Sequence, residues 1–284
     1  MAQLLELQPR GKEFAAIHAF GRNLDELART SASRAGRIPA GKHFCRAQVA
    51  HAEREDRHVG PIPGPALPER MMPRPDAASE GRANPEGIPR LYMADNRHTA
   101  IAEVRPWIGS LVSVAILRTT RDLKVVDCRP DDGGIMLFEH EPDGAEREAA
   151  IWTQVARAFR EPVLRGDDRA GYAATQVIAE LFEHLGYDGI LYGSGFGKGS
   201  TNVVLFDTTA AEIIACEIHA VRDVTLDHHE IDNPYHVRKK EDGSTEVYRM
   251  VITSIGPVGG PMINLEDDGE ADVIEPPSSS PDNP

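Results

Sequence analysis

The sequence predicts an α+β fold with a mixed or antiparallel β core and flanking helices, because strand-like segments outnumber helical ones and do not alternate strictly with them. Nearly unbroken apolar runs at residues 111–117 and 123–127 are typical of strands buried on both faces. Helices are expected at 146–159 and 173–185, where apolar residues recur at spacings of three and four. The other expected strands are residues 43–49, 91–94, 189–192, 202–206, 215–220 and 247–252.

Two further segments complete the pattern. Residues 11–33 predict a helix, since apolar side chains again recur three and four positions apart. Residues 57–75 are rich in proline and glycine, which predicts an extended or mobile loop without regular hydrogen bonding.

Composition limits the classes of protein that fit. The chain has 284 residues, 40% of them hydrophobic, which suits one large domain with additions. The net charge is −14, and the acidic C-terminal tail contains no Lys or Arg, so we expect no basic face for duplex nucleic acid. No apolar run reaches the ~18 residues of a membrane helix, and the first residues lack signal-peptide features. Three widely separated cysteines favour a reducing cytoplasm.

The most informative polar residues lie close together in the sequence. Arg82 stands in a turn after Gly81, and Tyr92 stands in a short strand ten residues later. Glu103 lies on the next helix, which Asp95 or Asn96 can cap and which should run to about residue 105. An arginine for phosphate, an aromatic ring for stacking and a carboxylate for a sugar cation are the parts needed to bind a dinucleotide and break its glycosidic bond.

Each of these residues also has a purely structural interpretation. Glu103 can pair with Arg97 or Arg105, as a lone helical glutamate usually does. Tyr92 can be a core aromatic, and Arg46 of the first strand can pair across the sheet. Taken together, they outline a pocket for stacking and anion binding.

The second half of the site is expected from the glycine-rich residues 187–206. Such a segment permits close approach of a ligand to the backbone, or forms a flexible hairpin. It contains no Walker P-loop, no G-x-G-x-x-G and no G-x-S-x-G, so it does not support a nucleoside triphosphatase or a hydrolase elbow. Ser194 is therefore expected to bind a ligand by hydrogen bonds rather than to act as a nucleophile.

Four separated motifs in this order resemble the RES domain family, over roughly residues 43–207. The motifs are Phe44-Cys45-Arg46; Gly81-Arg82-x-Asn84-Pro85 with Leu91-Tyr92-x-Ala94 and Glu103-Val104; Tyr187-Asp188-Gly189-Ile190-x-Tyr192-x-Ser194; and Asn202-x-Val204-Leu205-Phe206. Ala83 and Gly193 stand where the family often has Trp and Pro.

The resemblance implies a fold related to diphtheria-toxin-like ADP-ribosyltransferases and an activity that degrades NAD+ by phosphorolysis or hydrolysis. It also implies a toxin, often paired with an antitoxin. By position, Arg46, Glu103 and Ser194 match the three residues that name the family, while Tyr92 matches its pocket tyrosine and Arg82 a second arginine. A homo-oligomer is left open.

The chemistry of the residues agrees with these implied roles. A fixed carboxylate at Glu103 would stabilise the positive charge that develops on ribose when nicotinamide leaves. The other five residues would bind the dinucleotide: Arg46 and Arg82 at the pyrophosphate, Tyr92 by stacking, and Ser194 with Asn202 at ribose or carboxamide. NAD+ is then a substrate, phosphate a co-substrate in the phosphorolytic case, and no metal or other cofactor is required.

Three alternatives remain at this stage. The same pocket can transfer ADP-ribose to a protein or small-molecule acceptor, or serve as a non-catalytic sensor of NAD+ or ADP-ribose. A metal enzyme is suggested by Asp227-His228-His229-Glu230 and His236, although adjacent histidines on a strand point to opposite faces.

The expected domain organisation follows from the resemblance and the composition. We expect an N-terminal helical extension at residues 1–40 and a RES-like catalytic domain at 41–215. Strands at 216–262 should pack on the core, and an acidic tail at 263–284 should be disordered.

Overall fold

The computed structural model describes residues 23–130, 143–161, 170–196, 199–226, 228, 235–240, 243–249 and 272–273. The chain divides into two compact units, residues 1–224 and 225–284, and each is described by itself. None of the helices in these described ranges is long and apolar enough to span a bilayer.

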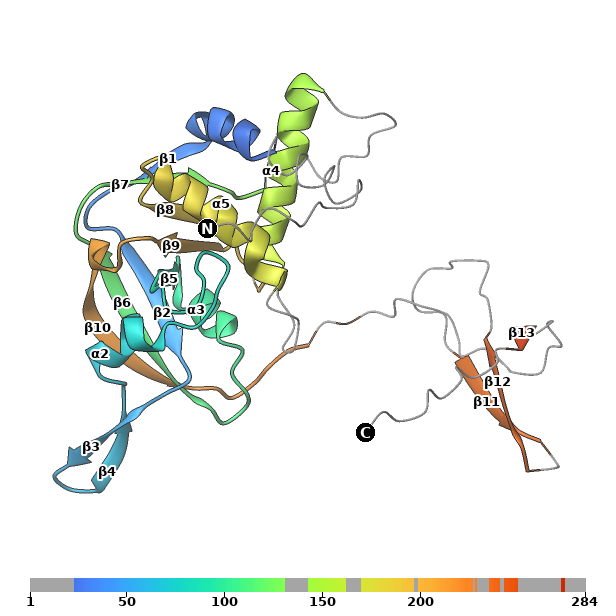
Figure 1. Cartoon of the computed structure of the whole chain (residues 1–284). Coiled ribbons are helices and arrows are strands. Elements are labelled where there is room, and N and C mark those ends of the chain that lie inside the picture. The colour runs from blue at the N-terminus through green and yellow to red at the C-terminus, as the bar shows by residue number, and fades with distance from the viewer. Residues whose placement is uncertain are drawn as a thin grey trace, which may run out of the picture. The chain divides into compact units, whose positions relative to one another are not determined.

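The first unit is built on an eight-stranded mixed sheet with the order β1-β7-β8-β9-β5-β2-β6-β10 (Figure 1). Every neighbouring pair is antiparallel except β7 and β8, which are parallel. This architecture confirms the predicted α+β class. The strands are β1 (Ala35–Ile38), β2 (His43–Gln48), β5 (Leu91–Ala94), β6 (Leu111–Thr119), β7 (Leu123–Asp127), β8 (Gly189–Gly193), β9 (Thr201–Leu205) and β10 (Ala211–Ala220).

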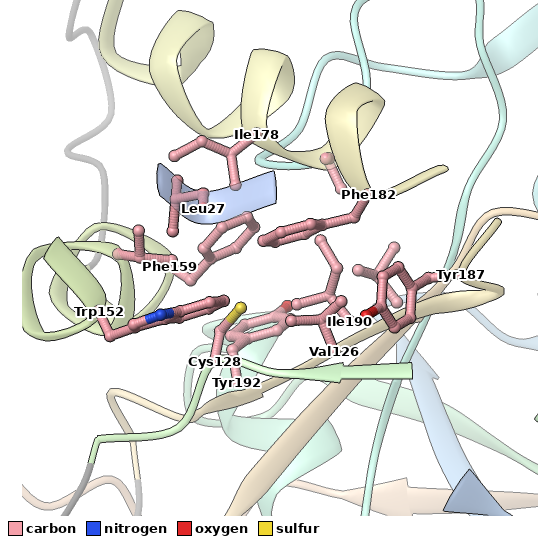
Figure 2. Packing of buried hydrophobic residues seen from close by; sticks show 14 of the residues in the cluster. Leu27, Val126, Cys128, Trp152, Phe159, Ile178, Phe182, Tyr187, Ile190 and Tyr192 are labelled. Atoms are coloured by element: carbon pink, nitrogen blue, oxygen red, sulfur yellow. The ribbon is translucent and has the colours of Figure 1, made fainter. Parts of the chain in front are cut away.

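Two long helices, α4 (Gly144–Arg160) and α5 (Ala170–His184), pack with a helical segment at residues 23–30 on one face of this sheet (Figure 1). Their apolar side chains meet those of β7 and β8 in an aromatic core, which Figure 2 shows. The Trp152 and Phe182 rings stack with their centroids 6.1 Å apart. The Trp152 indole N–H donates to Thr30 Oγ1 over 3.0 Å, so the core also holds the N-terminal segment.

The opposite face of the sheet has its own core. Successive strand residues alternate between faces, so Val204 packs toward α4 and α5 while Val203 and Leu205 pack on the other side. Met71 of the short helix α2 (Pro68–Met71) covers that second side and is fully buried.

The third helix, α3 (Arg97–Glu103), is the one that carries Glu103. It begins at Asn96, whose side-chain oxygen accepts a hydrogen bond from the Thr99 N–H over 2.9 Å. Ala100 of α3 packs on β2 and β6. The helix ends at Glu103, and Arg105, two residues later, has a φ of 46°. The predicted helix is confirmed, and of the two candidate caps Asn96 is the one that caps it.

The prediction of an irregular loop at residues 57–75 is wrong. Strands β3 (Ala52–Asp56) and β4 (Gly60–Gly64) form an antiparallel hairpin, and α2 follows it. Pro61 and Pro63 occupy alternate positions of β4, so both missing N–H groups fall on one edge of the strand, as a two-stranded sheet tolerates. The described part of this unit also contains three short 3-10 helices: η1 (Ser31–Arg34), η2 (Pro75–Ala77) and η3 (Thr208–Ala210).

Two strands of the main sheet do not coincide with the expected domain boundaries. Residues 35–38 fall within the expected helical extension but form β1 of the main sheet, and β10 runs across the expected limit at residue 215. The described part of the second unit is a small sheet of β11 (Tyr235–Lys239), β12 (Thr245–Arg249) and β13 (Asp272–Val273). Residues 1–22, 250–271 and 274–284, to which other expectations refer, lie outside the described residues.

Gly189 of β8 gives a direct test of this packing. A Cβ at Gly189 would collide with the carbonyl oxygen of Val204 and lie 3.0 Å from Leu205 Cδ2, whereas a Cβ at Gly36 of β1 meets Val125 Cγ2 at an ordinary 3.4 Å. We expect Gly189→Ala to lower the free energy of unfolding by about 2–4 kcal/mol and Gly36→Ala to change it by less than about 1 kcal/mol. Urea unfolding of both variants measures the difference, and equal effects would contradict the tight β8–β9 contact.

Candidate active site

A cavity of about 410 Å³ opens where strands β2 and β5 separate. The two strands share a single residue pair, Cys45 with Ala94, and beyond it they no longer form a ladder. Residues of both strands line the cavity, together with the end of α3, the turn after Ser79 and the start of α5. Five of the six predicted site residues are in the lining: Arg46, Arg82, Tyr92, Glu103 and Asn202.

The carboxylate of Glu103 is fixed by two neutral side chains. Its Oε1 accepts hydrogen bonds from Ser194 Oγ over 2.8 Å and from Asn202 Nδ2 over 2.5 Å. The alternative ion pair with Arg97 is not formed, because Arg97 pairs with Glu217 at 2.7 Å. Among the described residues, no donor reaches Glu103 Oε2, so this oxygen can accept a bond from a ligand.

Ser194, the sixth predicted residue, reaches Glu103 from outside the cavity lining. It directly follows β8, and its backbone N–H donates to the carbonyl of Ser200 over 2.9 Å. Its Oγ also accepts from the N–H of Phe196 over 3.0 Å, which leaves the hydroxyl proton for Glu103. Ser194 is only 2% exposed, so its orientation is set by the protein.

Asn202 reaches the same carboxylate from β9. It is paired with Tyr192 of β8 on one side and with Ala94 of β5 on the other, in the middle of the sheet. Its side chain is 3% exposed, and its Oδ1 has no hydrogen-bond partner in the described structure. The sheet therefore presents Asn202 as a donor to Glu103.

Tyr92 anchors the turn that carries Arg82. Its hydroxyl accepts from the Ala83 N–H over 2.8 Å and donates to Asn84 Oδ1 over 2.7 Å. Burial raises the pKa of Tyr92 to about 12. A Cβ at Gly81 would lie 2.7 Å from the same hydroxyl, which explains why glycine begins this turn.

Gln176 of α5 also holds this turn. Its Nε2 lies 3.1 Å from Glu80 Oε1 and 3.0 Å from the carbonyl oxygens of Gly81 and Asn84. Gln176 was not predicted as a site residue, because it stands within an amphipathic helical pattern.

The two arginines of the cavity contact backbone oxygens instead of carboxylates. Arg46 Nη1 donates to the carbonyl of Tyr92 over 3.0 Å, bridging the strands where their ladder stops. Arg82 Nη2 donates to the carbonyl of Glu161, the residue after α4. In the described part of the chain neither forms an ion pair, and the Nε of each is buried without a partner.

Burial lowers the pKa of Arg46, because a guanidinium that leaves water loses hydration. A buried cation without a carboxylate partner is costly, and a guanidinium carries five donors of which few are used here. Arg46 and Arg82 therefore suit an anionic ligand entering this cavity.

Two aromatic residues of the lining were not predicted as site residues. Tyr172 comes from the first turns of α5, and Tyr192 comes from β8. Tyr192 is fully enclosed, so burial raises its pKa, and its ring lies 5.8 Å from that of Phe159. With the predicted Tyr92 they give the cavity three tyrosines.

The metal alternative receives no support from the described residues. No group of three or more His, Cys, Asp or Glu side chains within them could hold a metal ion. Asp227, His229 and Glu230 of the suggested cluster lie outside the described residues.

These features define an α+β protein with a cavity that combines a fixed carboxylate, two guanidinium groups and aromatic walls. The RES domain profile matches residues 57–229, more than half of the chain. The chain therefore belongs to the RES domain family. The matched residues include every predicted site residue except Arg46, which lies before residue 57.

Comparison with other proteins adds little beyond the family. No curated protein sequence matches the chain. Among solved structures, the M. tuberculosis MbcT–MbcA toxin–antitoxin complex contains a similar chain, with 16% identity, a TM-score of 0.36, and coverage of 69% of this chain and 93% of that one. A likeness this distant carries no information on function.

The Tyr92 hydroxyl can be tested against a tyrosine of the same cavity. Tyr92→Phe removes the partner of the Ala83 N–H and of Asn84 Oδ1, so we expect a loss of about 1–3 kcal/mol in the free energy of unfolding. Tyr172→Phe removes a hydroxyl that has no hydrogen bond within the described structure and should change it by less than about 0.5 kcal/mol. Chemical denaturation compares the two, and an unchanged Tyr92→Phe would show that the hydroxyl does not hold the turn.

Proposed function

We propose that this chain is an enzyme that degrades NAD+ by breaking the bond between nicotinamide and ribose. The observation that carries the proposal is the Glu103 carboxylate, which lines the cavity and is held by Ser194 and Asn202. Because both donors bind Oε1, they fix the carboxylate without neutralising its charge. A fixed negative charge is what a reaction through a sugar cation requires.

The proposed chemistry uses the charge already present on NAD+. When the bond between C1″ of ribose and the nicotinamide nitrogen breaks, its electron pair stays on nicotinamide, which leaves as a neutral molecule. The ribose is left with an oxocarbenium-like positive charge. Glu103 stabilises that charge more than it stabilises the ground state. Its Oε2 can accept a hydrogen bond from the 2″-hydroxyl of the same sugar.

The rest of the cavity suits the rest of the dinucleotide. Arg46 and Arg82 offer guanidinium donors to the diphosphate, and an anion there would offset the cost of burying Arg46. The tyrosine rings of the lining provide apolar surface for a planar base or for ribose. Ser194 and Asn202 act in this account as positioning residues for Glu103.

A second reactant completes the reaction at C1″. An oxygen of hydrogen phosphate forms the new bond in phosphorolysis and yields ADP-ribose-1″-phosphate. Water forms it in hydrolysis and yields ADP-ribose with release of one proton. Transfer to a protein or small-molecule acceptor would use the same cavity and differ only in the nucleophile.

We also propose a biological role from the family resemblance. An enzyme that drains NAD+ stops growth, so the chain would act as a toxin. A partner protein of the antitoxin kind would then control it by covering the entrance of the cavity.

The proposal is tested by nicotinamide release from NAD+ by purified protein, with and without phosphate, followed by chromatography of both products. Glu103→Gln keeps the size of the side chain but removes its charge, so we expect the rate to fall by at least ~10²-fold. Glu212→Gln is the matched control. Glu212 lies on the edge strand β10, where it forms a solvent-exposed ion pair with Arg118, so its substitution should leave the rate unchanged.

Each product identifies the nucleophile. ADP-ribose-1″-phosphate that requires phosphate indicates phosphorolysis, and ADP-ribose indicates hydrolysis. Nicotinamide release that Glu103→Gln retains in full would contradict the proposed role of the carboxylate, and intact NAD+ without an added acceptor would favour transfer or sensing.

A further inference from the structure

A second, smaller cavity of about 120 Å³ adjoins the candidate active site. Both cavities are lined by Arg46, Gln48, Ser79 and Tyr92, so they share a wall. Glu103 lines the first cavity but not the second. The smaller cavity therefore lies beyond the shared residues, away from the carboxylate proposed to act on the nicotinamide ribose.

The size of the smaller cavity limits what it can hold. Pockets that take a whole small-molecule ligand usually measure about 300–1,000 Å³. A cavity of about 120 Å³ suits one compact group of a larger ligand, and the rest of that ligand would occupy the first cavity.

Four arginines line the smaller cavity, and no carboxylate is in its described lining. They are Arg46 of β2, Arg70 of α2, Arg74 shortly after α2, and Arg90 just before β5. These arginines and the rest of the described lining fall between Arg46 and Tyr92, in a part of the chain that is described without a gap. Guanidinium groups from separate elements around one small space are the donors that phosphate oxygens accept.

Two of these four positive charges are already paired. Arg74 forms an ion pair with Asp76, and Arg90 forms one with Glu183. Neither carboxylate lines the cavity.

The other two charges, on Arg46 and Arg70, have no carboxylate partner in the described part of the chain. Arg46 donates to the carbonyl of Tyr92, and the Arg70 side chain forms no ion pair or hydrogen bond there. Glu80 of the neighbouring cavity lies 3.1 Å from the Gln176 amide instead of pairing with either arginine. The described wall of the smaller cavity thus favours an anion.

Arg70 is placed at this cavity by the residue that follows it. Met71 is fully buried in the core, and α2 lies against β2 (Figure 1), so the backbone of Arg70 is fixed although its side chain is exposed. The Met72 N–H closes the turn by donating to the Pro68 carbonyl over 3.2 Å. A fixed backbone and an exposed guanidinium suit recognition of a group that enters from solvent.

The proposed orientation of the dinucleotide indicates which group this is. With the nicotinamide ribose at Glu103 and the diphosphate at Arg46 and Arg82, the next part of the molecule is the ribose of adenosine. In NADP+ this ribose carries a phosphate on its 2′-oxygen, and arginine is a residue that binds such a phosphate in other dinucleotide sites.

We propose that the smaller cavity binds the 2′-phosphate of NADP+ through Arg70, so that the protein accepts NADP+ as a substrate as well as NAD+. The inference rests on the proposed function for the reaction, but the binding can be tested without it. The bond that breaks, between ribose and nicotinamide, is the same in both dinucleotides.

Binding is measured on the full chain by calorimetric titration with two nucleotides that differ in one group. Adenosine 2′,5′-bisphosphate carries the 2′-phosphate, and adenosine 5′-monophosphate lacks it. We expect the bisphosphate to bind about tenfold more tightly and Arg70→Gln to remove that advantage. Arg54→Gln is the matched control, because Arg54 is an exposed arginine of β3 that lines neither cavity.

The titration decides the inference by itself. An advantage of the bisphosphate that Arg70→Gln loses and Arg54→Gln keeps would support it. Equal affinity for the two nucleotides, no binding of the bisphosphate, or an advantage that Arg70→Gln retains would overturn it.

Nicotinamide release from NADP+ and NAD+ then tests the role of Arg70 in the reaction. We expect Arg70→Gln to raise the KM for NADP+ about tenfold with kcat retained, because the 2′-phosphate is remote from the breaking bond and is bound alike in the ground and transition states. Both constants for NAD+ should stay unchanged. An equal rise in KM for the two dinucleotides would place the diphosphate at Arg70 and overturn the inference.

The two proposals fail in distinguishable ways. If the protein releases nicotinamide from neither dinucleotide, the proposed function fails, and the titration still decides whether the smaller cavity binds the 2′-phosphate. If nicotinamide is released from NAD+ but the two nucleotides bind equally, the proposed function stands without this site.

Discussion

The site depends on one interaction, the pair of hydrogen bonds that Ser194 and Asn202 donate to a single oxygen of Glu103. A carboxylate at the end of a seven-residue helix would otherwise be free to turn toward solvent or toward a nearby cation. Two nearly fully buried donors hold it in place with its charge intact. The sheet order makes this possible, because β8 and β9 are neighbours and β5, which leads into α3, is the next strand.

The charges around this carboxylate are kept apart. Glu103 is bound by neutral side chains, while Arg46 and Arg82 bind backbone carbonyls. A direct ion pair would satisfy both charges and leave little for a ligand. Separate opposite charges in one cavity instead favour a ligand with an anionic part and a part that becomes cationic, which describes a dinucleotide losing nicotinamide.

The separation of β2 from β5 is the structural feature that creates the space. A continued ladder would place backbone hydrogen bonds where the cavity lies. Arg46 replaces part of that ladder by donating to the Tyr92 carbonyl, so the same residue closes the gap in the sheet and presents its guanidinium to the cavity. The hydroxyl of Tyr92, a residue of β5, then holds the Arg82 turn through its hydrogen bonds with Ala83 and Asn84.

Much of this could be predicted from the sequence, and the failures have physical reasons. Apolar periodicity located α4, α5 and the buried strands, and capping chemistry located α3, since these signals are local. The partners of Glu103 lie 91 and 99 residues away, and only the register of the sheet decides that Ser194 and Asn202 reach it rather than Arg97. The hairpin at Ala52–Gly64 was missed because alternate prolines resemble a loop. Gln176 was missed because a helical stripe indicates packing alone, and Tyr172 because it lies before the start of the helix expected at 173–185, whereas α5 begins at Ala170.

Ser194 is proposed to act through Glu103, and a double-mutant cycle on kcat for nicotinamide release separates this role from direct contact with the substrate. Ser194→Ala should reduce kcat in the native background with little change in the KM for NAD+, and should cause no further loss in the Glu103→Gln background. An equal loss in both backgrounds, or a rise in KM with kcat retained, would contradict the account, because Ser194 would then act on the substrate independently of Glu103.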